Sequence, residues 1–237
     1  EMAAAQGYGI ELDVRLSRDG VPMVFHDGSL SRMCGRGGSV EEIDAAELQK
    51  IALKGSPQRI PTLAETLCVV EGRVPILVEL KSGLLGMPGA FERAVNGQIS
   101  NYSGPLAIIA FNPLSLVWFQ INAPHILRGQ LSSSPLTLVW SLRCAMRALK
   151  GERLRHSSIP DVLTFIKQKG IRPFLWVHCG SPHFIAVWVD DLPDLFSWYL
   201  RLTGTPVLAW TIRDTESATN AVRHASNFIF EGPYQPV

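Results

Sequence analysis

Two short apolar stretches carry acidic side chains at a spacing that chemistry can use. Glu11 and Asp13 lie in GIELDVR, and Glu79 and Lys81 lie in VELK. Residues two apart in a β-strand face the same side, so each stretch presents its pair together. Carboxylates that are crowded and withdrawn from water stay ionised only beside a cation or strong donors. Because oxygen ligands favour hard cations, we expect Glu11, Asp13 and Glu79 to hold one divalent cation, Mg²⁺ or Ca²⁺, with Mn²⁺ also suitable.

A histidine follows the first pair at the end of a second strand-like run, PMVFH, after the turn-like RDG. His26 can give or take a proton near neutral pH. A carboxylate-bound metal beside a histidine suits cleavage of a phosphoester, and Lys81 can meet an anionic substrate. A lone Glu-x-Asp or His-Asp pair is usually structural. The order of GIELDVRLSRDGVPMVFHD followed by VELK is what favours a site.

The elements that must position these residues alternate between apolar strands and amphipathic helices. This pattern predicts a parallel sheet covered on both faces. Seven barrel-type strands are expected, centred near Leu12, Leu77, Ile108, Leu127, Val187, Leu208 and Ile229. PMVFH is expected to form a local hairpin on the first of them. Two helices are expected to begin with capping boxes, Asp44 with Glu47 and Thr62 with Glu65.

Seven strands are one short of a (β/α)8 barrel, an α/β fold whose chemistry lies at the carboxyl ends of the strands. The chain opens with EMAAAQG, which is typical of the end of a helix and its glycine stop. We therefore expect a TIM barrel whose first strand is missing from this sequence. A single domain over residues 1–237 is expected, because barrels of this length usually form one.

The composition excludes several classes of protein. Of 237 residues, 46% are hydrophobic and 18% are charged, which supports a sizeable core. The 22 basic and 21 acidic residues leave a net charge of +1, so charge makes no case for nucleic acid or a membrane surface. We expect no membrane span and no signal peptide, and hence a cytoplasmic location. The four cysteines are expected to be free thiols, and the oligomeric state is left open.

The stretch ELDVRLSRDGVPMVFHDGSLSR resembles the signature of the glycerophosphodiester phosphodiesterases, which are metal-dependent (β/α)8 barrels. The likeness continues through RIPTLAETL and VELK, and more weakly through IIAFNP, HILRG, PVLAWTI and FIFEG. The resemblance implies a small-molecule glycerophosphodiester substrate. It also implies hydrolysis of that substrate to glycerol 3-phosphate and an alcohol by metal-assisted general acid/base catalysis.

The resemblance also implies roles for individual residues. Three positions match the family's metal ligands: Glu11, Asp13 and Glu79. His26 matches one of two catalytic histidines, and Lys81 matches a lysine expected to contact the phosphate. Trp210 matches an aromatic residue that lines the substrate pocket. The resemblance assigns no role to Arg128, but this residue sits at a predicted strand end and has the fork of donors that suits a phosphate, so we add it as a substrate-binding residue.

The sequence departs from the family in one respect. The family's first strand carries His-Arg-Gly followed by Glu-Asn, and neither motif is present here, so we expect both to lie upstream. Two alternative functions stay open. One is a phospholipase-type phosphodiesterase that forms a cyclic phosphate, with Leu84, Leu85 and Met87 as an apolar rim. The other is an inactive barrel that only binds phosphate compounds. The segment from Phe174 to Pro182 has no assigned role.

Overall fold

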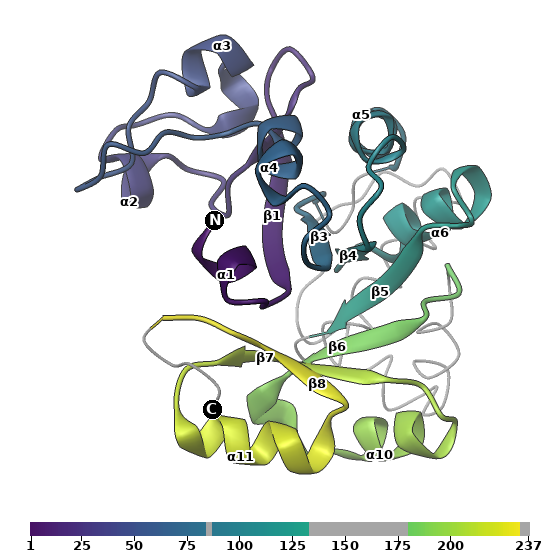
Figure 1. Ribbon diagram of the computed structural model, residues 1–237. Helices are drawn as coiled ribbons and strands as arrows, with labels where there is room; N and C mark the ends of the chain where they lie inside the picture. Colours follow the sequence, from purple (N-terminus) through teal and green to yellow (C-terminus); the bar gives the residue numbers. More distant parts are fainter. Residues whose placement is uncertain (84–86, 133–179, 233–237) are drawn as a thin grey trace, which may run out of the picture. The chain divides into compact units, whose positions relative to one another are not determined.

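The computed structural model describes residues 1–83, 87–132 and 180–232 (Figure 1). These residues belong to two compact units. The first comprises Glu1–Ser82, Pro88–Ile109 and Ile121–Ile126, and the second comprises Gly83–Met87, Ala110–Gln120 and Leu127–Val237. The helices expected over RCAMRALK and SSIPDVLTFIKQKG, the run FLWVHC, and Leu84 and Leu85 lie outside the described residues.

The first unit is built on two strands that bring the acidic stretches side by side. Strand β1 (Ile10–Leu16) pairs antiparallel with β2 (Pro22–Val24) and parallel with β3 (Ile76–Leu80). The expected hairpin on the first strand is therefore confirmed. The register places Asp13 of β1 directly opposite Glu79 of β3. Figure 1 shows β1 beside β3.

The remaining elements up to residue 122 are short helices and one more strand, and most of α6 belongs to the second unit. They are α1 (Met2–Ala5), α2 (Ser31–Cys34), η1 (Val40–Glu42), α3 (Ala45–Leu48), α4 (Leu63–Val70), α5 (Ala90–Ile99), β4 (Leu106–Ala110) and α6 (Pro113–Asn122).

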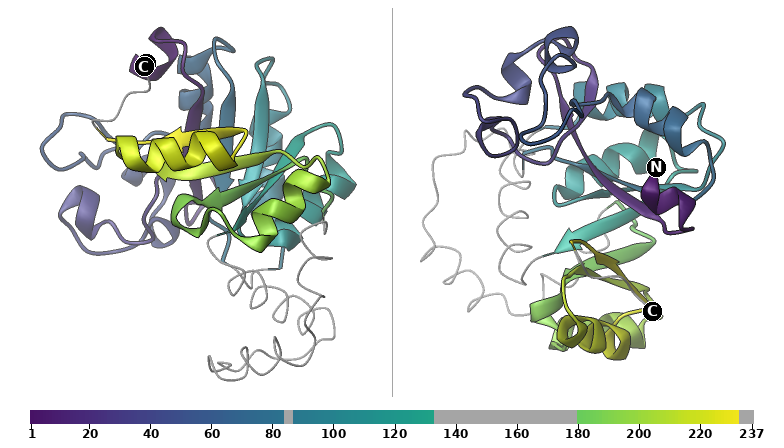
Figure 2. Two further views of the ribbon diagram at one scale, coloured as in Figure 1. Left: turned by 90° about the horizontal axis from the view of Figure 1, so that it is seen from below. Right: turned by 60° about the vertical axis from the view of Figure 1, so that its left-hand side comes forward.

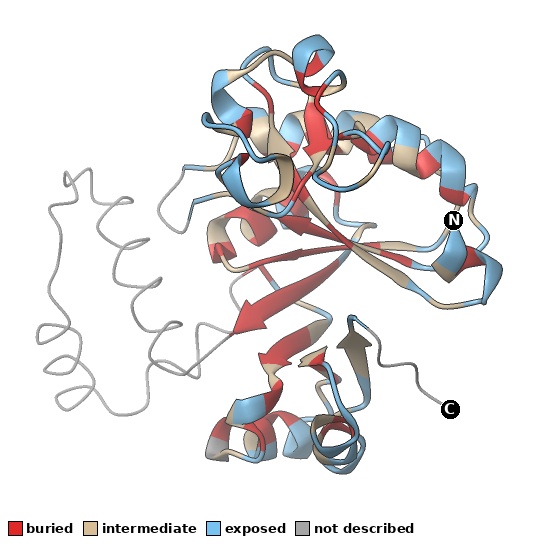
Figure 3. Cartoon of the chain, turned by 90° about the vertical axis from the view of Figure 1, so that its left-hand side faces the viewer, coloured by how far each residue is buried: buried red, intermediate tan, exposed pale blue. Residues whose placement is uncertain are grey.

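The two faces of β1 and β3 have opposite characters. Leu12 and Val14 are buried, and so are Ile76, Val78 and Leu80 on the matching face of β3. Alternation along each strand therefore turns the acidic residues to the other side. Figure 3 shows buried residues along the strands and exposed residues on the outer turns of the helices.

A separate apolar cluster supports the segment after β2. Met23 and Phe25 at the end of the hairpin pack with Leu30 and Leu48, and three of these four are fully buried. Leu30 directly precedes α2, and its N–H donates to the carbonyl of Gly38 at 3.0 Å. The segment from Phe25 to α2 is thus held at both ends by buried side chains.

One of the two expected capping boxes is confirmed, and the other is wrong. Thr62 accepts from the Glu65 N–H at 3.1 Å, and Glu65 accepts from the Thr62 N–H at 2.8 Å. Asp44 makes no such cap, because both of its oxygens bind the guanidinium of Arg18. The helix that follows Asp44, α3, is a single turn.

The second unit contains four parallel strands in sequence order. They are β5 (Leu127–Ser132), β6 (Phe184–Trp188), β7 (Val207–Ile212) and β8 (Asn227–Phe230). Between them lie η2 (Val189–Asp191), α10 (Leu195–Leu202) and α11 (Thr215–His224). With β1, β3 and β4, these strands confirm all seven expected barrel-type strands.

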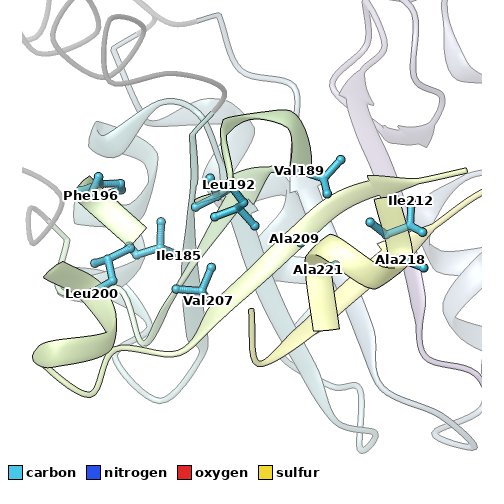
Figure 4. Packing of buried hydrophobic residues seen from close by; sticks show 11 residues of the cluster. Ile185, Val189, Leu192, Phe196, Leu200, Val207, Ala209, Ile212, Ala218 and Ala221 are labelled. Atoms are coloured by element: carbon cyan, nitrogen blue, oxygen red, sulfur yellow. The ribbon is translucent and has the colours of Figure 1, made fainter. Parts of the chain in front are cut away.

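Helices α10 and α11 lie on the same side of β6, β7 and β8 (Figures 1 and 2). Their buried side chains pack against the strands, as Figure 4 shows for Ile185, Leu200 and Val207. Both helices begin at an aspartate that accepts a backbone N–H, Asp194 from Ser197 at 2.7 Å and Asp214 from Ser217 at 2.8 Å. In the described part of the chain, no helix is long and apolar enough to cross a membrane.

Candidate active site

The three acidic residues singled out in the sequence meet at one point of the first unit. One carboxylate oxygen from each of Glu11, Asp13 and Glu79 lies within 4.8 Å of the others. We call this group the β1–β3 carboxylates. Period-two alternation turns Glu11 and Asp13 to one face of β1, and the strand register sets Glu79 beside them. Elsewhere among the described residues, no three His, Cys, Asp or Glu side chains converge in this way.

A lysine lies inside the group. The Lys81 ammonium is 2.9 Å from Asp13 Oδ1 and 2.6 Å from Glu79 Oε1. The Lys81 N–H donates to the carbonyl of Val14 at 3.0 Å, which continues the β1–β3 pairing and fixes the base of the side chain. The side chains of Asp13 and Lys81 are 17% and 16% exposed, and that of Glu79 is 9% exposed. These charges therefore face one another with little water between them.

Burial and charge act against each other in this group. Burial raises the pKa of the Glu79 carboxyl, and the nearby Lys81 ammonium only partly opposes that rise. Burial lowers the pKa of Lys81, but the negative charges of Glu79 and Asp13 outweigh it and hold that pKa above its usual value. Lys81 thus offsets only part of the cost of burying the charged Glu79 carboxylate.

The donor set fits a divalent cation. Three carboxylates and one ammonium leave a formal charge of −2 in a largely buried place. Carboxylate oxygens are the ligands that Mg²⁺, Ca²⁺ and Mn²⁺ prefer. A doubly charged ion among these oxygens would balance that charge.

His26 lies on the same unit, at the end of the β2 hairpin. The Phe25 N–H donates to the carbonyl of Asp13 at 2.9 Å, so the chain entering His26 is tied to a residue of the β1–β3 carboxylates. The His26 carbonyl accepts from Arg15 Nε at 2.9 Å. A positive charge on the imidazole would also lower the pKa of Glu79, so the two groups are within electrostatic range.

Arg15 continues the face of Glu11 and Asp13 along β1, and it is engaged on both sides. Besides its bond to the His26 carbonyl, its Nη1 is 2.9 Å from a carboxylate oxygen of Glu41. Arg15 therefore positions the segment that carries His26.

The His26 ring is held by two residues that the sequence analysis had not placed in the site. His26 Nδ1 is 2.7 Å from Asp27 Oδ1, and Arg32 of α2 binds both oxygens of Asp27, through Nε at 2.6 Å and Nη2 at 2.7 Å. The sequence gives Asp27 and Arg32 no role, because a lone His-Asp pair is usually structural.

The two remaining predicted site residues lie in the second unit. Arg128 of β5 is 4% exposed. Its Nε donates to the carbonyl of Gly180 at 3.0 Å and its Nη2 approaches the carbonyl of Ser181 at 3.4 Å. Burial lowers the pKa of its guanidinium. These contacts tie the chain at Gly180 to β5, and a role for Arg128 in binding substrate stays a prediction.

Trp210 of β7 belongs to a group of aromatic rings. Its ring packs edge-to-face with Trp188 at a centroid distance of 4.9 Å and with Phe111 at 5.7 Å. Its Nε1 is buried and has no hydrogen-bond partner among the described residues. A half-buried indole suits a pocket wall, and contact with substrate stays a prediction.

Comparison with solved structures establishes the class of fold. A phosphodiesterase from Oleispira antarctica, solved in complex with the product sn-glycerol-3-phosphate, aligns over 97% of this chain and 83% of its own with a TM-score of 0.72 at 22% identity. A putative glycerophosphoryl diester phosphodiesterase from Silicibacter pomeroyi aligns over 97% and 82% with a TM-score of 0.71 at 19% identity. The fold is therefore the α/β barrel, as the sequence predicted.

Comparison of sequences then identifies the family. Residues 1–178 match the model of the glycerophosphoryl diester phosphodiesterase family. A glycerophosphodiester phosphodiesterase from Caldanaerobacter subterraneus subsp. tengcongensis is 30% identical over 176 residues, 71% of this chain and 72% of the relative. One from Bacillus altitudinis is 33% identical over 128 residues, 50% of this chain and 52% of the relative.

The chain therefore belongs to the glycerophosphoryl diester phosphodiesterase family. It is an enzyme, a phosphoric diester hydrolase that acts on glycerophosphodiesters. The sequence predictions of family, fold and activity are confirmed. The roles of the individual residues and the choice of cation are matters for proposal.

Proposed function

We propose that Glu11, Asp13 and Glu79 bind one divalent cation, Mg²⁺ or Ca²⁺ with Mn²⁺ as a further choice. We further propose that catalysis takes place beside it. The observation that carries this proposal is the convergence of the three carboxylates around Lys81 with a formal charge of −2. When bound, the cation supplies positive charge that offsets the charge of a phosphodiester. The remaining chemistry falls to side chains of this chain.

Lys81 is proposed to bind a phosphate oxygen of the substrate. Its ammonium is already directed at the centre of the β1–β3 carboxylates, and a bound cation would share those carboxylates with it. A lysine partly released from its carboxylates has donors to offer an anion. Arg128 and Trp210 are proposed as further substrate contacts, on the phosphate and along the pocket wall respectively.

His26 is proposed to protonate the departing alcohol. Hydrolysis joins an oxygen of water to phosphorus and breaks the bond between phosphorus and the alcohol oxygen. One group must accept the proton of the water, and another must give a proton to the alcohol. The Asp27 bond at Nδ1 leaves His26 Nε2 as the nitrogen that can serve the substrate. The opposite assignment, with His26 taking the proton of water, uses the same nitrogen.

The test is an assay of the full chain on glycerophosphocholine with Ca²⁺, Mg²⁺ or Mn²⁺ supplied in turn. We expect release of glycerol 3-phosphate and choline, abolished by a chelator and restored by one of the three ions. The His26→Ala variant should lose about 10²- to 10⁴-fold in kcat. The matched control is His125→Ala, at an exposed histidine outside the candidate site. Equal activities of the two variants would exclude a catalytic role for His26.

Phosphorus NMR of the product tests the alternative chemistry. Hydrolysis gives an open phosphate monoester, whereas a phospholipase-type reaction gives a cyclic phosphate. Met87, in the apolar rim expected for that alternative, is 65% exposed, which leaves the alternative worth testing. A cytoplasmic location, expected from the sequence, remains a prediction.

A further inference from the structure

The loop and helix that follow His26 contain an ion pair between Asp27 and Arg32, and this pair also contacts the His26 ring. Asp27 uses Oδ1 for both His26 Nδ1 and Arg32 Nη2, each at 2.7 Å, and Oδ2 for Arg32 Nε at 2.6 Å. The two Arg32 contacts form a bidentate fork, the arrangement in which a guanidinium fixes the plane of a carboxylate. With the plane fixed, the direction in which Asp27 accepts from His26 is fixed as well.

The His26 ring has little else to hold it. Its side chain is 62% exposed, and within the described part of the chain Asp27 is the only hydrogen-bond partner of the ring. An exposed imidazole without a partner samples several rotamers. The bond from Asp27 therefore determines both the orientation of the ring and the nitrogen that carries the proton, Nδ1.

The fork itself stands on a firm base. Arg32 lies in α2, and the residue before that helix, Leu30, is fully buried among Met23, Phe25 and Leu48. The Cys34 N–H donates to the Leu30 carbonyl at 2.8 Å. Because buried Leu30 fixes the start of α2, this single helical turn places Arg32 beside Asp27.

Charge explains why an arginine is needed beside the aspartate. Asp27 lies next to a site whose substrate is an anion, so an uncompensated carboxylate there would repel it. The guanidinium of Arg32 neutralises Asp27 while leaving Oδ1 able to accept from His26. Its hydrogen bond is also the largest cause of the strongly lowered pKa of Asp27, which keeps the carboxyl ionised.

We propose that Arg32 is a positioning residue for catalysis, acting through Asp27 to hold the His26 ring in one orientation with Nε2 toward the substrate. This inference rests on the proposed catalytic role of His26. It adds a route by which α2, a helix outside the β1–β3 carboxylates, sets the rate of the proton transfer.

A double-mutant cycle tests the route. Asp27→Asn is expected to lower kcat about 100-fold with KM changed less than about threefold, and Arg32→Gln about tenfold. If Arg32 acts on His26 through Asp27, the double variant should be no slower than Asp27→Asn. Arg32→Lys should fall between wild type and Arg32→Gln, since lysine restores the charge without the fork. If the two losses multiply in the double variant, the proposal is wrong.

The chain offers a matched control for a purely structural role. Arg18 and Asp44 form a second fork, at 2.8 and 2.6 Å, and the Arg18 side chain is 63% exposed against 64% for Arg32. Arg18→Gln breaks a fork of equal exposure that holds no histidine. It should leave kcat within about twofold. A loss equal to that of Arg32→Gln would overturn the proposal.

A spectroscopic readout separates positioning from folding. Nitrogen NMR of the protein labelled at histidine should show His26 protonated at Nδ1 when neutral, and a mixture of tautomers in Asp27→Asn and Arg32→Gln. An unchanged tautomer in both variants would count against the proposal even if activity fell. If His26→Ala retains full activity, the proposed function of His26 fails; if His26→Ala is inactive and Asp27→Asn is not, only the present inference fails.

Discussion

Each of the two units contains a group of three acidic residues, but only in the first unit do the three carboxylates converge on one point. The β1–β3 carboxylates converge within 4.8 Å, and Lys81 lies among them. The second group, Asp190, Asp191 and Asp194 around η2 and the start of α10, is equally rich in charge along the sequence. We call it the η2–α10 aspartates.

The carboxylates of the second group do not share a common partner. Asp190 accepts from Trp188 Nε1 at 2.8 Å, and Asp194 caps α10. Asp191 keeps one buried oxygen without a hydrogen-bond partner among the described residues. Because these carboxylates do not share a centre, they do not make a cation site. The comparison teaches that convergence across two strands, rather than the number of acids in a segment, is what indicates a metal.

The largest expected effect is the removal of a converging carboxylate. Glu79→Gln should lower kcat/KM by about 10³-fold or more, because it removes a ligand and about 4 kcal/mol of charge stabilisation with it. The matched change in the second group, Asp190→Asn, should leave kcat/KM within about twofold. Calorimetric titration with Ca²⁺ should show binding to wild type and Asp190→Asn and none to Glu79→Gln. Equal binding to all three would remove the β1–β3 carboxylates as the cation site.

The next largest effect is expected from Lys81, the lysine that lies among the β1–β3 carboxylates and has no counterpart in the second group. Lys81→Met should lower kcat/KM about 10- to 100-fold through the lost phosphate contact. The same variant should bind the cation more tightly than wild type, since no ammonium competes for Asp13 and Glu79. Lys50→Met is the control, because Lys50 pairs only with Glu47 on the surface at 2.6 Å. Weaker cation binding by Lys81→Met would contradict the assigned role.

A smaller effect is expected from the cap in the second group. Asp194→Ala removes the acceptor for the Ser197 N–H and should destabilise the fold by about 1 kcal/mol. Activity at a temperature well below unfolding should be retained. Thermal unfolding followed by circular dichroism measures the first quantity, and the glycerophosphocholine assay measures the second. A loss of activity at full folding would mean that this group does more than support α10.

The smallest effect concerns Asp191 and has the opposite sign. Burial, with the like charges of Asp194 and Asp190, raises the pKa of the Asp191 carboxyl above its value in the unfolded chain. The cost to folding therefore begins as the pH rises past the unfolded value of about 3.9 and is fully present above the folded-state pKa. Asp191→Asn should raise the midpoint of thermal unfolding at pH 7, and the gain should fade as the pH falls toward 4. A constant gain at all pH values would exclude ionisation as its cause.

Much of the fold could be predicted from the sequence because its signals are local. The seven strands followed from apolar runs between helices, and the acidic pairs followed from period-two alternation. The Thr62 and Glu65 box was predictable because both partners lie within one turn. Strand register was not readable from these patterns, yet it is the register that sets Asp13 opposite Glu79.

The parts that could not be predicted depend on long-range competition for a side chain. Asp44 has the spacing of a cap, but Arg18, 26 residues earlier, takes both of its oxygens. Arg32 lies on a one-turn helix and is largely exposed, so neither period nor hydrophobicity marks it. Arg128 follows the expected strand pattern, but its nearly complete burial depends on a segment some fifty residues later. Local patterns carry no information on such partners.

The alternation in β1 also limits how this region can change length. Leu12 and Val14 face the core while Glu11 and Asp13 face the candidate site, so each step along the strand exchanges the two environments. An insertion or deletion of one residue between them would drive a charge into the apolar side and an aliphatic group toward the cation. A gain or loss of two residues would keep the apolar and the acidic residues on their own faces of β1. Changes in the length of this strand should therefore come in even numbers of residues.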